Sequence, residues 1–271
     1  MKLQKCQGII LKKSVFQEAD VHLEVLCKEL YDQKYTRKKF VVHGILKSKR
    51  RNPIVVELGN LVQIDYYEKD INETQNVKEI QLIERFWEFK SQYQNFELLG
   101  KILEITYYAS MSDQRELKEI YVLLLKGLEF LQSYVLKEKE DVKKIIEELS
   151  LDFSSIFLLF FSVRVLMFMG YVGDLVHCSF CHDPLDGLAK WQEKLYFYCR
   201  KCDATANVID YYYSFFLQQI KQKKFSNFIK FLKQLHIQKS IDRIDELLWE
   251  LQKRIEIHLK EIIPMKRSLF I

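Results

Sequence analysis

The hydrophobic pattern of this chain changes its period once, near residue 85, and that change constrains the fold more than any other feature. Before it, apolar residues alternate with polar ones, which is the pattern of half-buried strands. The alternation is clearest at Val21, Leu23, Val25 and Cys27. After it, apolar residues recur at helical spacing, which indicates amphipathic helices. The chain is therefore expected to open with a β-domain and to continue with helices.

Five short strands are expected in the first region, and they lie at 8–11, 21–27, 40–42, 54–64 and 77–83. Five strands within about 80 residues at the start of a chain are typical of a small closed barrel such as the OB-fold. We therefore predict an OB-fold nucleic-acid-binding domain over residues 1–84.

The remainder, residues 85–271, is predicted to be a mostly α-helical domain. Asp113 and Glu116 have the spacing of a capping box, and the helix after them has one apolar face. That face consists of Leu117, Ile120, Tyr121, Leu124, Leu128 and Leu131. Further apolar faces lie at 145–159 and 241–259. Only 8 Gly and 3 Pro occur in the chain, so long helices and short loops are expected.

Four cysteines form two Cys-x-x-Cys pairs, Cys178 with Cys181 and Cys199 with Cys202, and 17 residues separate the pairs. At this spacing two knuckles bring four thiolates to the corners of a tetrahedron, the coordination that Zn²⁺ prefers. Four protein ligands leave no position for water, so the ion is expected to be structural. We predict one zinc ion per chain, in a module at about 174–205 inserted in the helical domain, and an α+β fold overall.

Other interpretations of the cysteines stay open. Iron in a rubredoxin-like site would use the same ligands, and His177 or His182 could replace one of them. Four unrelated core thiols are a further alternative. Cys6 and Cys27 have no partner at ligand spacing, so we interpret them as small core residues.

Positive charge is concentrated in residues 34–51, where eight cations occur without one acid. They are Lys34, Arg37, Lys38, Lys39, Lys47, Lys49, Arg50 and Arg51. The stretch covers the third predicted strand and the loop after it, and OB-folds bind oligonucleotides on the strand 2–3 face. A cluster of cations attracts a polyanion because neutralised phosphates release their counterions.

Tyr31, Tyr35 and Phe40 are interleaved with these cations. Aromatic rings beside cations suit single strands, since bases stack on the rings and phosphates pair with the charges. We predict that the eight cations, with Tyr31 and Tyr35, bind DNA, whereas Phe40 could point into the barrel. The alternative is a solvated edge strand that Lys residues keep from aggregating.

A second acid-free stretch spans residues 211–240 and carries six lysines. They are Lys221, Lys223, Lys224, Lys230, Lys233 and Lys239. Phenylalanines lie among them at helical spacing, so an amphipathic helix with a lysine face and a second DNA surface both fit the pattern.

Several classes of function lack their motifs here. The sequence has neither Gly-x-x-x-x-Gly-Lys nor Gly-x-Gly-x-x-Gly, so no nucleotide and no enzymatic activity are expected. The N-terminus lacks the apolar run of a signal peptide, and the apolar stretch 156–169 is shorter than the roughly 20 residues that span a bilayer. We expect a cytoplasmic protein without membrane contact, whose cysteines stay reduced.

Short motifs follow one another in a specific order along the chain. They lie at 8–11, 18–20, 44–49, 161–166, 169–171, 258–259 and 266–270. Gly170-Tyr171 stands just before the first cysteine pair. In this order and with this placement, the chain resembles the bacterial RecO family of DNA recombination mediators over essentially its whole length.

The resemblance implies an OB barrel, a helical bundle and an inserted zinc module. It implies binding of single- and double-stranded DNA, annealing of complementary strands, and loading of RecA, together with RecR, onto strands coated by single-strand-binding protein (SSB). The partners implied are DNA, RecR, the C-terminal tail of SSB and, indirectly, RecA. The place implied is the cytoplasm, in association with the nucleoid.

Two further functions fit the residues. One is a generic OB-fold and zinc-ribbon accessory factor of transcription or translation that binds nucleic acid. The other is a structural adaptor whose helical domain docks partner proteins, because a basic helical groove suits an acidic peptide.

Overall fold

The computed structural model describes residues 2–16, 18–48, 52–68, 73–111, 116–237 and 244–262. The chain packs into two compact units, 1–136 and 137–271, and each unit is described by itself. The predicted boundary after residue 84 coincides with the end of the last barrel strand. The boundary between the units lies further along because the three helices after the barrel belong to the same unit.

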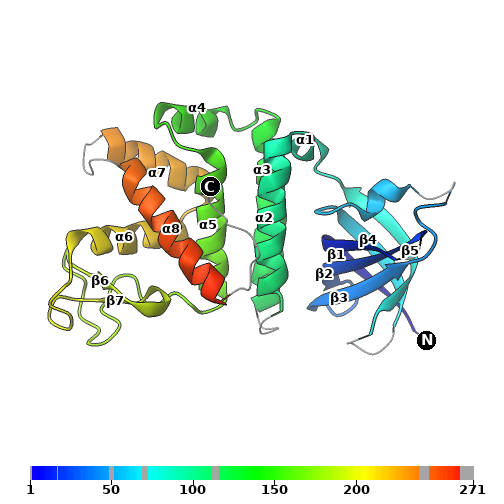
Figure 1. The fold of residues 1–271 in the computed structure, drawn as a ribbon, viewed down its shortest axis with the longest axis horizontal. Coiled ribbons are helices and arrows are strands. Elements are labelled where there is room, and N and C mark those ends of the chain that lie inside the picture. The colour runs from blue at the N-terminus through cyan, green and yellow to red at the C-terminus, as the bar shows by residue number, and fades with distance from the viewer. Residues whose placement is uncertain are drawn as a thin grey trace. The chain divides into compact units, whose positions relative to one another are not determined.

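The first unit begins with a closed barrel of five strands (Figure 1). The strands are β1 (Leu3–Phe16), β2 (Asp20–Glu29), β3 (Tyr35–Val42), β4 (Leu61–Tyr67) and β5 (Gln75–Glu84). Their order around the barrel is β1-β2-β3-β5-β4, and β1 also pairs with β4 to close it. The β3–β5 pairing is parallel, whereas β1–β2, β2–β3, β1–β4 and β4–β5 are antiparallel. The predicted fold class is confirmed.

The segment before β4 differs from the prediction of a strand starting at residue 54. Pro53–Val56 forms a 3-10 turn instead. Asn52 caps this turn, because its Oδ1 accepts a hydrogen bond of 3.0 Å from the Ile54 N–H. Proline is suited to the first turn of a helix, where a free N–H is not needed. The apolar residues Val55 and Val56 were correctly predicted to be buried, since both side chains lie in the barrel core. Their pattern could not distinguish a strand from a 3-10 turn.

Strand β1 holds one extra residue relative to β2. Ile10 lies opposite Val25, while Lys12 lies opposite Glu24, so Leu11 is the additional residue. Such a bulge reverses the alternation of side chains between the two faces of a strand. Up to Ile10 the even-numbered residues of β1 face the barrel core, and from Lys12 onward the even-numbered residues face outward.

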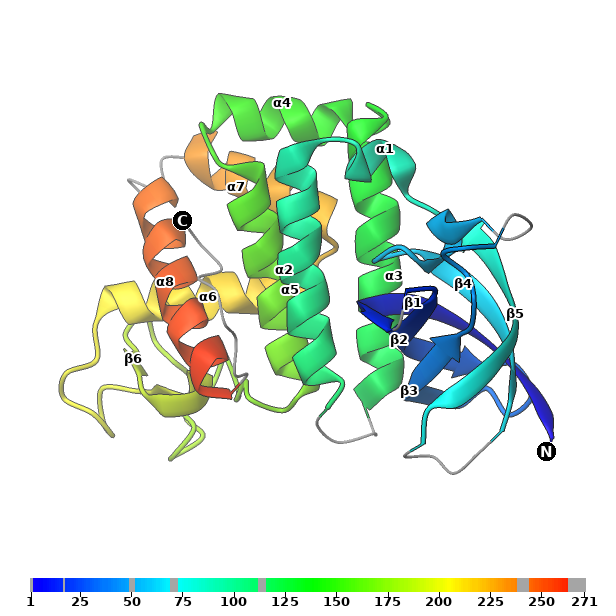
Figure 2. The same ribbon diagram turned by 45° about the vertical axis from the view of Figure 1, so that its right-hand side comes forward.

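Three helices complete the first unit, and two of them lie along the barrel (Figure 2). They are α1 (Trp87–Lys90), α2 (Tyr93–Ala109) and α3 (Leu117–Val135). Helix α2 contacts β1, and α3 contacts β2 and β3. The predicted apolar face of α3 is confirmed, because all six of its residues are buried. Asp113 of the predicted capping box lies outside the described residues, and Glu116 makes no side-chain capping bond with the described ones.

The second unit is a helical bundle with a small inserted module. Its helices are α4 (Glu140–Glu148), α5 (Phe153–Phe168), α6 (Val208–Gln222), α7 (Phe225–Ile237) and α8 (Ile244–Ile262). Helix α5 is apolar on all sides and contacts α6 and α8, so it forms the core of the bundle. Asp152 starts this helix, since its carboxylate accepts a 2.7 Å bond from the Ser155 N–H.

None of the described helices is long and apolar enough by itself to cross a bilayer. Helices α4 and α5 satisfy the length and composition test only as a pair, and a bend of 108° separates them.

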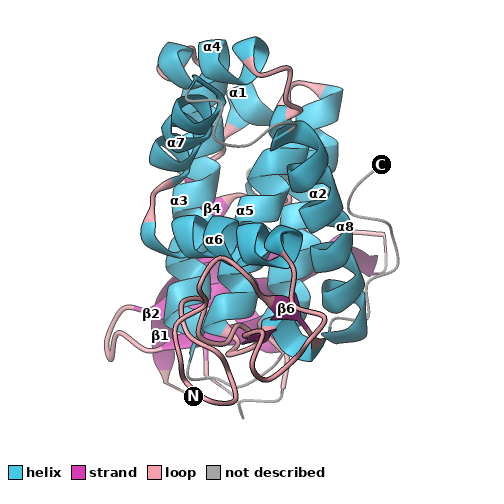
Figure 3. Cartoon of the chain, turned by 90° about the vertical axis from the view of Figure 1, so that its left-hand side faces the viewer, coloured by secondary structure: helices cyan, strands magenta, loops and turns pink. Residues whose placement is uncertain are grey.

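The inserted module lies between α5 and α6 in the sequence and is mostly loop (Figure 3). Its regular structure is a hairpin of β6 (Lys190–Trp191) and β7 (Phe197–Tyr198), joined through a 3-10 turn at Glu193–Leu195. Strands of 2 residues cannot hold a fold through backbone hydrogen bonds alone. The module therefore needs other contacts to keep its shape.

Candidate metal centre and nucleic-acid face

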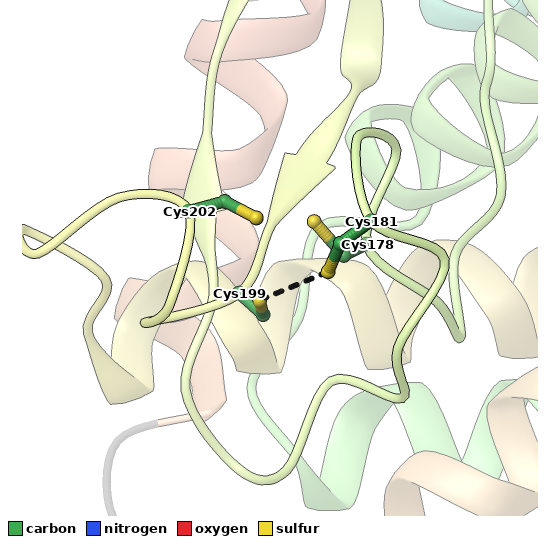
Figure 4. A group of neighbouring side chains, drawn as sticks. All are labelled: Cys178, Cys181, Cys199 and Cys202. Atoms are coloured by element: carbon green, nitrogen blue, oxygen red, sulfur yellow. Dashed lines mark hydrogen bonds between the residues drawn. The ribbon is translucent and has the colours of Figure 1, made fainter.

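The four cysteines of the two pairs meet in the inserted module. Their Sγ atoms all lie within 4.8 Å of one another. The first pair comes from the loop after α5 and the second from the turn after β7, and their sulfurs point toward a common centre (Figure 4). Sulfurs at this separation can hold a single metal ion. The predicted grouping of these residues is confirmed.

Backbone hydrogen bonds shape each cysteine knuckle into a tight turn. In the first, the His182 N–H donates to the carbonyl of Cys178 at 3.0 Å. In the second, the Cys202 N–H donates to the carbonyl of Cys199, also at 3.0 Å. The Ser179 N–H donates to the Phe197 carbonyl at 2.8 Å and so connects the first knuckle to β7. The Cys-x-x-Cys spacing thus corresponds to one turn, which explains why the sequence alone could identify it.

The electrostatics of the knuckles favour a thiolate at Cys178 and a protonated thiol at Cys202. Burial would raise the pKa of the Cys178 thiol, but backbone N–H groups of Cys181, Cys199 and Phe180 donate to its sulfur and lower the pKa to about 6. The pKa of Cys202 is raised to about 12, first because its thiol shares a hydrogen bond with Cys181 and then because of burial. The Cys178 thiolate therefore carries a negative charge that a cation would neutralise, and a bound cation would also favour loss of the proton from Cys202.

The other candidate ligands lie elsewhere. The Nδ1 atom of His177 is 3.0 Å from a carboxylate oxygen of Asp174, and neither histidine beside the knuckle joins the group of four sulfurs. Cys6 and Cys27 are fully buried in the barrel core, as predicted. Burial is also the main reason why the pKa of Cys27 is raised.

A buried carboxylate anchors the module to the helices of its unit. The carboxylate of Asp210 in α6 accepts a 3.0 Å hydrogen bond from the backbone N–H of Trp191. It also forms an ion pair with Arg254 of α8, at 3.1 Å. The ring of Trp191 stacks on His258 of α8 at 5.6 Å. Sequence reasoning missed these contacts, because Trp191 and Asp210 are far along the chain from Arg254 and His258.

The predicted DNA-binding residues of the basic stretch lie in different environments, some buried and some exposed. Lys38 points into the barrel, where it is 9% exposed. Its Nζ lies 2.8 Å from Glu29 Oε1 and donates to the hydroxyl of Tyr66, which in turn donates to Glu29 at 3.0 Å. Burial, followed by the charge of Glu29, raises the pKa of Tyr66. The prediction that Lys38 contacts DNA is therefore corrected, since its charge is neutralised inside the barrel.

Tyr35 and Arg37 alternate with Lys38 and face the helices of the first unit. The ring of Tyr35 packs edge-on against Tyr121 of α3, with centroids 5.2 Å apart. Arg37 lies over the ring of Tyr107 in α2 and 3.4 Å from Glu24. Tyr35 and Arg37 were both predicted to contact DNA, but both are half-buried and pack against side chains of the same unit. Phe40 lies in the barrel core, where it packs against Tyr66.

Four predicted residues reach solvent in the described part of the chain: Tyr31, Lys34, Lys39 and Lys47. Tyr31 is 72% exposed, and with Lys34 it borders a pocket of about 580 Å³ at one end of the barrel. Lys47 is ion-paired with Glu18. The remaining three, Lys49, Arg50 and Arg51, lie outside the described residues.

In the second basic stretch, two lysines of α7 pair with acids of α4. Lys230 lies 2.8 Å from Asp141, and Lys233 lies 2.6 Å from Glu148. Lys223 covers the ring of Phe231. These contacts support the amphipathic-helix interpretation, since the paired charges bind helices of the same unit.

The family comparisons agree with this architecture. A family model described as recombination protein O, N terminal, matches residues 1–86, which is the barrel. Two proteins named DNA repair protein RecO, from the Ames and Paris strains of Leptospira biflexa serovar Patoc, are each 30% identical to this chain over 190 residues. The matched region covers 70% of this chain and 67% of each relative.

Proposed function

Because this chain belongs to the RecO family of DNA repair proteins, we propose that it binds single- and double-stranded DNA and anneals complementary strands during recombination. The observation that carries the proposal is a closed OB-type barrel with exposed cations on its surface. Lys34 and Lys39 are exposed and form no ion pair with a residue in the described ranges, so their charges are available to phosphates. Lys47, Lys49, Arg50 and Arg51 complete the proposed contacts, with Tyr31.

The proposed role of the cysteines is to hold one structural zinc ion. Cys178, Cys181, Cys199 and Cys202 supply four sulfurs and leave no ligand position for water. Zinc would supply folding energy to the module and no Lewis-acid chemistry. The hydrogen bonds that lower the pKa of Cys178 prepare the site for a cation.

The proposed mechanism is equilibrium binding without covalent turnover or nucleotide. A basic surface reduces the repulsion between two strands, so encounters last longer and base pairing can begin. Aromatic contacts hold bases by stacking and leave the pairing edges free to meet a second strand. In the cell, this activity would act in the cytoplasm, at the nucleoid, with RecR and the SSB tail as partners, and would help load RecA.

The decisive experiment measures the annealing rate of complementary strands against the concentration of the full chain, without ATP. A bridging protein accelerates annealing at substoichiometric to equimolar coverage, whereas a protein that only coats single strands slows it. A charge-reversed variant of Lys34, Lys39 and Lys47 should bind more weakly and should flatten the salt dependence by about 0.7 log units per lost single-strand phosphate contact.

Two results would contradict the proposal. Inhibition of annealing at every concentration, with or without SSB, would favour the generic OB-fold accessory factor. An unchanged salt slope in the charge-reversed variant would place the DNA elsewhere, with Lys221 and Lys224 as the next candidates, because both are exposed.

A further inference from the structure

The outer face of strands β1 to β3 is divided into a covered half and an open half. In the covered half, Ile9 and Leu26 are fully buried, and Arg37 lies under α2. In the open half, the bulge at Leu11 turns alternate residues of β1 outward. Cross-strand pairing there forms two rows: Lys12 beside Glu24 and Lys39, and Ser14 beside His22 and the buried Val41.

An exposed aromatic pair lies at the end of these rows. Phe16 is the last residue of β1 and is 50% exposed. Its ring packs against His22 of β2, with centroids 4.9 Å apart. A half-exposed phenylalanine held in place by a second ring is a flat surface that is already ordered, so little rotational freedom is lost when another ring stacks on it.

Acids and cations both lie around the pair. Three acids in the turn before β2 and in the first half of that strand have partners: Glu18 with Lys47, Asp20 with His43, and Glu24 with Arg37. Lys39 forms no ion pair with any residue that the structure describes. Lys12 is 58% exposed, and its Nζ lies 3.9 Å from Glu24 and 5.0 Å from the centre of the Tyr107 ring of α2. These two cations border a hollow of about 270 Å³ that His22 and Ser14 also line.

We propose that Phe16 and His22 form a base-stacking platform for single-stranded DNA, and that Lys12 and Lys39 hold the phosphate beside the stacked base. This inference deepens the proposed DNA-binding function and rests on it. It moves the principal aromatic contact from Tyr31, in the loop after β2, to the opposite end of the same strand. Of these four residues, only Lys39 is among the DNA contacts predicted from the sequence.

The geometry favours a single strand over the alternatives. In a duplex the base faces are covered by their neighbours, so a protein ring can stack only where the duplex opens. A protein partner would meet the same exposed phenylalanine, but it would also have to neutralise Lys12 and Lys39, whereas a nucleic-acid backbone brings phosphates of its own.

The test compares the full-length wild type with Phe16→Ala and His22→Ala in fluorescence anisotropy titrations. The probes are a labelled single-stranded oligonucleotide and a blunt duplex of the same sequence, at one fixed salt concentration. Loss of one stacked base should weaken single-strand binding by about 5- to 150-fold in Phe16→Ala. Duplex binding should change by less than about 2-fold, since stacking makes no contribution there.

Two control variants separate stacking from general disturbance of the hairpin. Val15→Ala removes an apolar side chain that is even more exposed, at 62%, from the adjacent position and should leave both affinities unchanged. Phe16→Tyr keeps the aromatic ring and should restore single-strand binding. Lys39→Gln should reduce the salt slope for single strands by about 0.7 log units.

The inference is overturned if Phe16→Ala leaves single-strand affinity unchanged while the wild type binds DNA. It is also overturned if single-strand and duplex affinities fall equally, because that pattern reports loss of charge or fold. A wild-type chain that binds neither probe would instead refute the proposed function itself.

Discussion

The barrel and the cysteine module both enclose charged side chains, but they neutralise that charge differently. In the barrel, the carboxylate of Glu29 meets the ammonium of Lys38, and the hydroxyl of Tyr66 donates to the same carboxylate. In the module, four thiols gather at one point, and the neighbouring cation, Lys201, is ion-paired with Asp183. The barrel therefore neutralises its buried charge by itself, whereas the four sulfurs of the module form a group that can hold a metal ion from solution.

The two regions also differ in how much regular structure supports them. The barrel strands are 7 to 14 residues long and close on themselves, with a continuous apolar core. The module has strands of 2 residues and is tied to its helices mainly through Asp210 and Trp191. We infer that a change that destabilises the barrel leaves the module intact, and that a change that destabilises the module leaves the barrel intact.

The largest effect is expected from removal of the metal. Replacing Cys199 with Ser should abolish stoichiometric zinc and destabilise the second unit, because structural zinc contributes about 10 kcal/mol or more to comparable sites. A melting temperature lower by at least about 10 °C is expected for the transition of that unit. Metal analysis and calorimetry provide the measurements.

The control for metal removal is Cys27→Ala in the barrel, which should leave the zinc content unchanged. If the chelated wild type melts at the same temperature as the zinc-loaded protein, the dependence of the module on an ion is refuted.

The next largest effect is expected from breaking the charge pair in the barrel. Lys38→Met leaves the Glu29 carboxylate buried without its cation, which should lower the free energy of unfolding by about 3–5 kcal/mol. The double variant with Glu29→Gln removes both charges and should recover much of this loss. Urea unfolding of the three proteins measures the coupling, and equal losses in the single and double variants would contradict it.

A smaller, pH-dependent effect is expected from Lys90 of α1, whose Nζ donates to the fully buried Asn60 at 2.6 Å. Burial lowers the pKa of Lys90 from its ordinary value of 10.5 to about 8. Between these values the unfolded chain binds a proton that the folded chain has released, so stability should rise with pH across this window. The free energy of unfolding should rise by at most about 3 kcal/mol, which is the free energy that corresponds to this shift in the pKa of Lys90.

Denaturant unfolding at several pH values tests this expectation, with Lys90→Met as the control. The variant should lose the positive slope between about pH 8 and the onset of tyrosine ionisation near pH 10. A wild-type stability that falls over this window would show that Lys90 keeps its proton in the folded state.

The smallest effect is expected from the exposed ion pairs between α4 and α7. The side chains of Lys230 and Asp141 are 52% and 54% exposed, so water screens their attraction. Lys230→Met should change the free energy of unfolding by less than about 1 kcal/mol. It should also leave DNA affinity nearly unchanged, and a strong loss of affinity would restore α7 as a second DNA surface.

Features set by local spacing could be predicted from the sequence. Each Cys-x-x-Cys is a single turn, so the four ligands could be named, and the helical period of α3 identified each residue that it buries. The count of barrel strands followed from alternation in the same way. By contrast, the turn at Pro53 was misassigned as strand, because a short apolar run reports burial and not backbone geometry.

The sequence by itself determined the order of the barrel and the helices, the grouping of the four cysteines and the apolar faces, because these depend on neighbours along the chain. Only the tertiary structure decided which cations of the basic stretch face solvent. Lys38 points inward to Glu29, Arg37 lies under α2, and Lys39 is left exposed, although the three residues are consecutive. A single extra residue at Leu11 turned Phe16 outward. Side-chain direction in a strand depends on register with its neighbours, and register is set by strands that are distant in sequence.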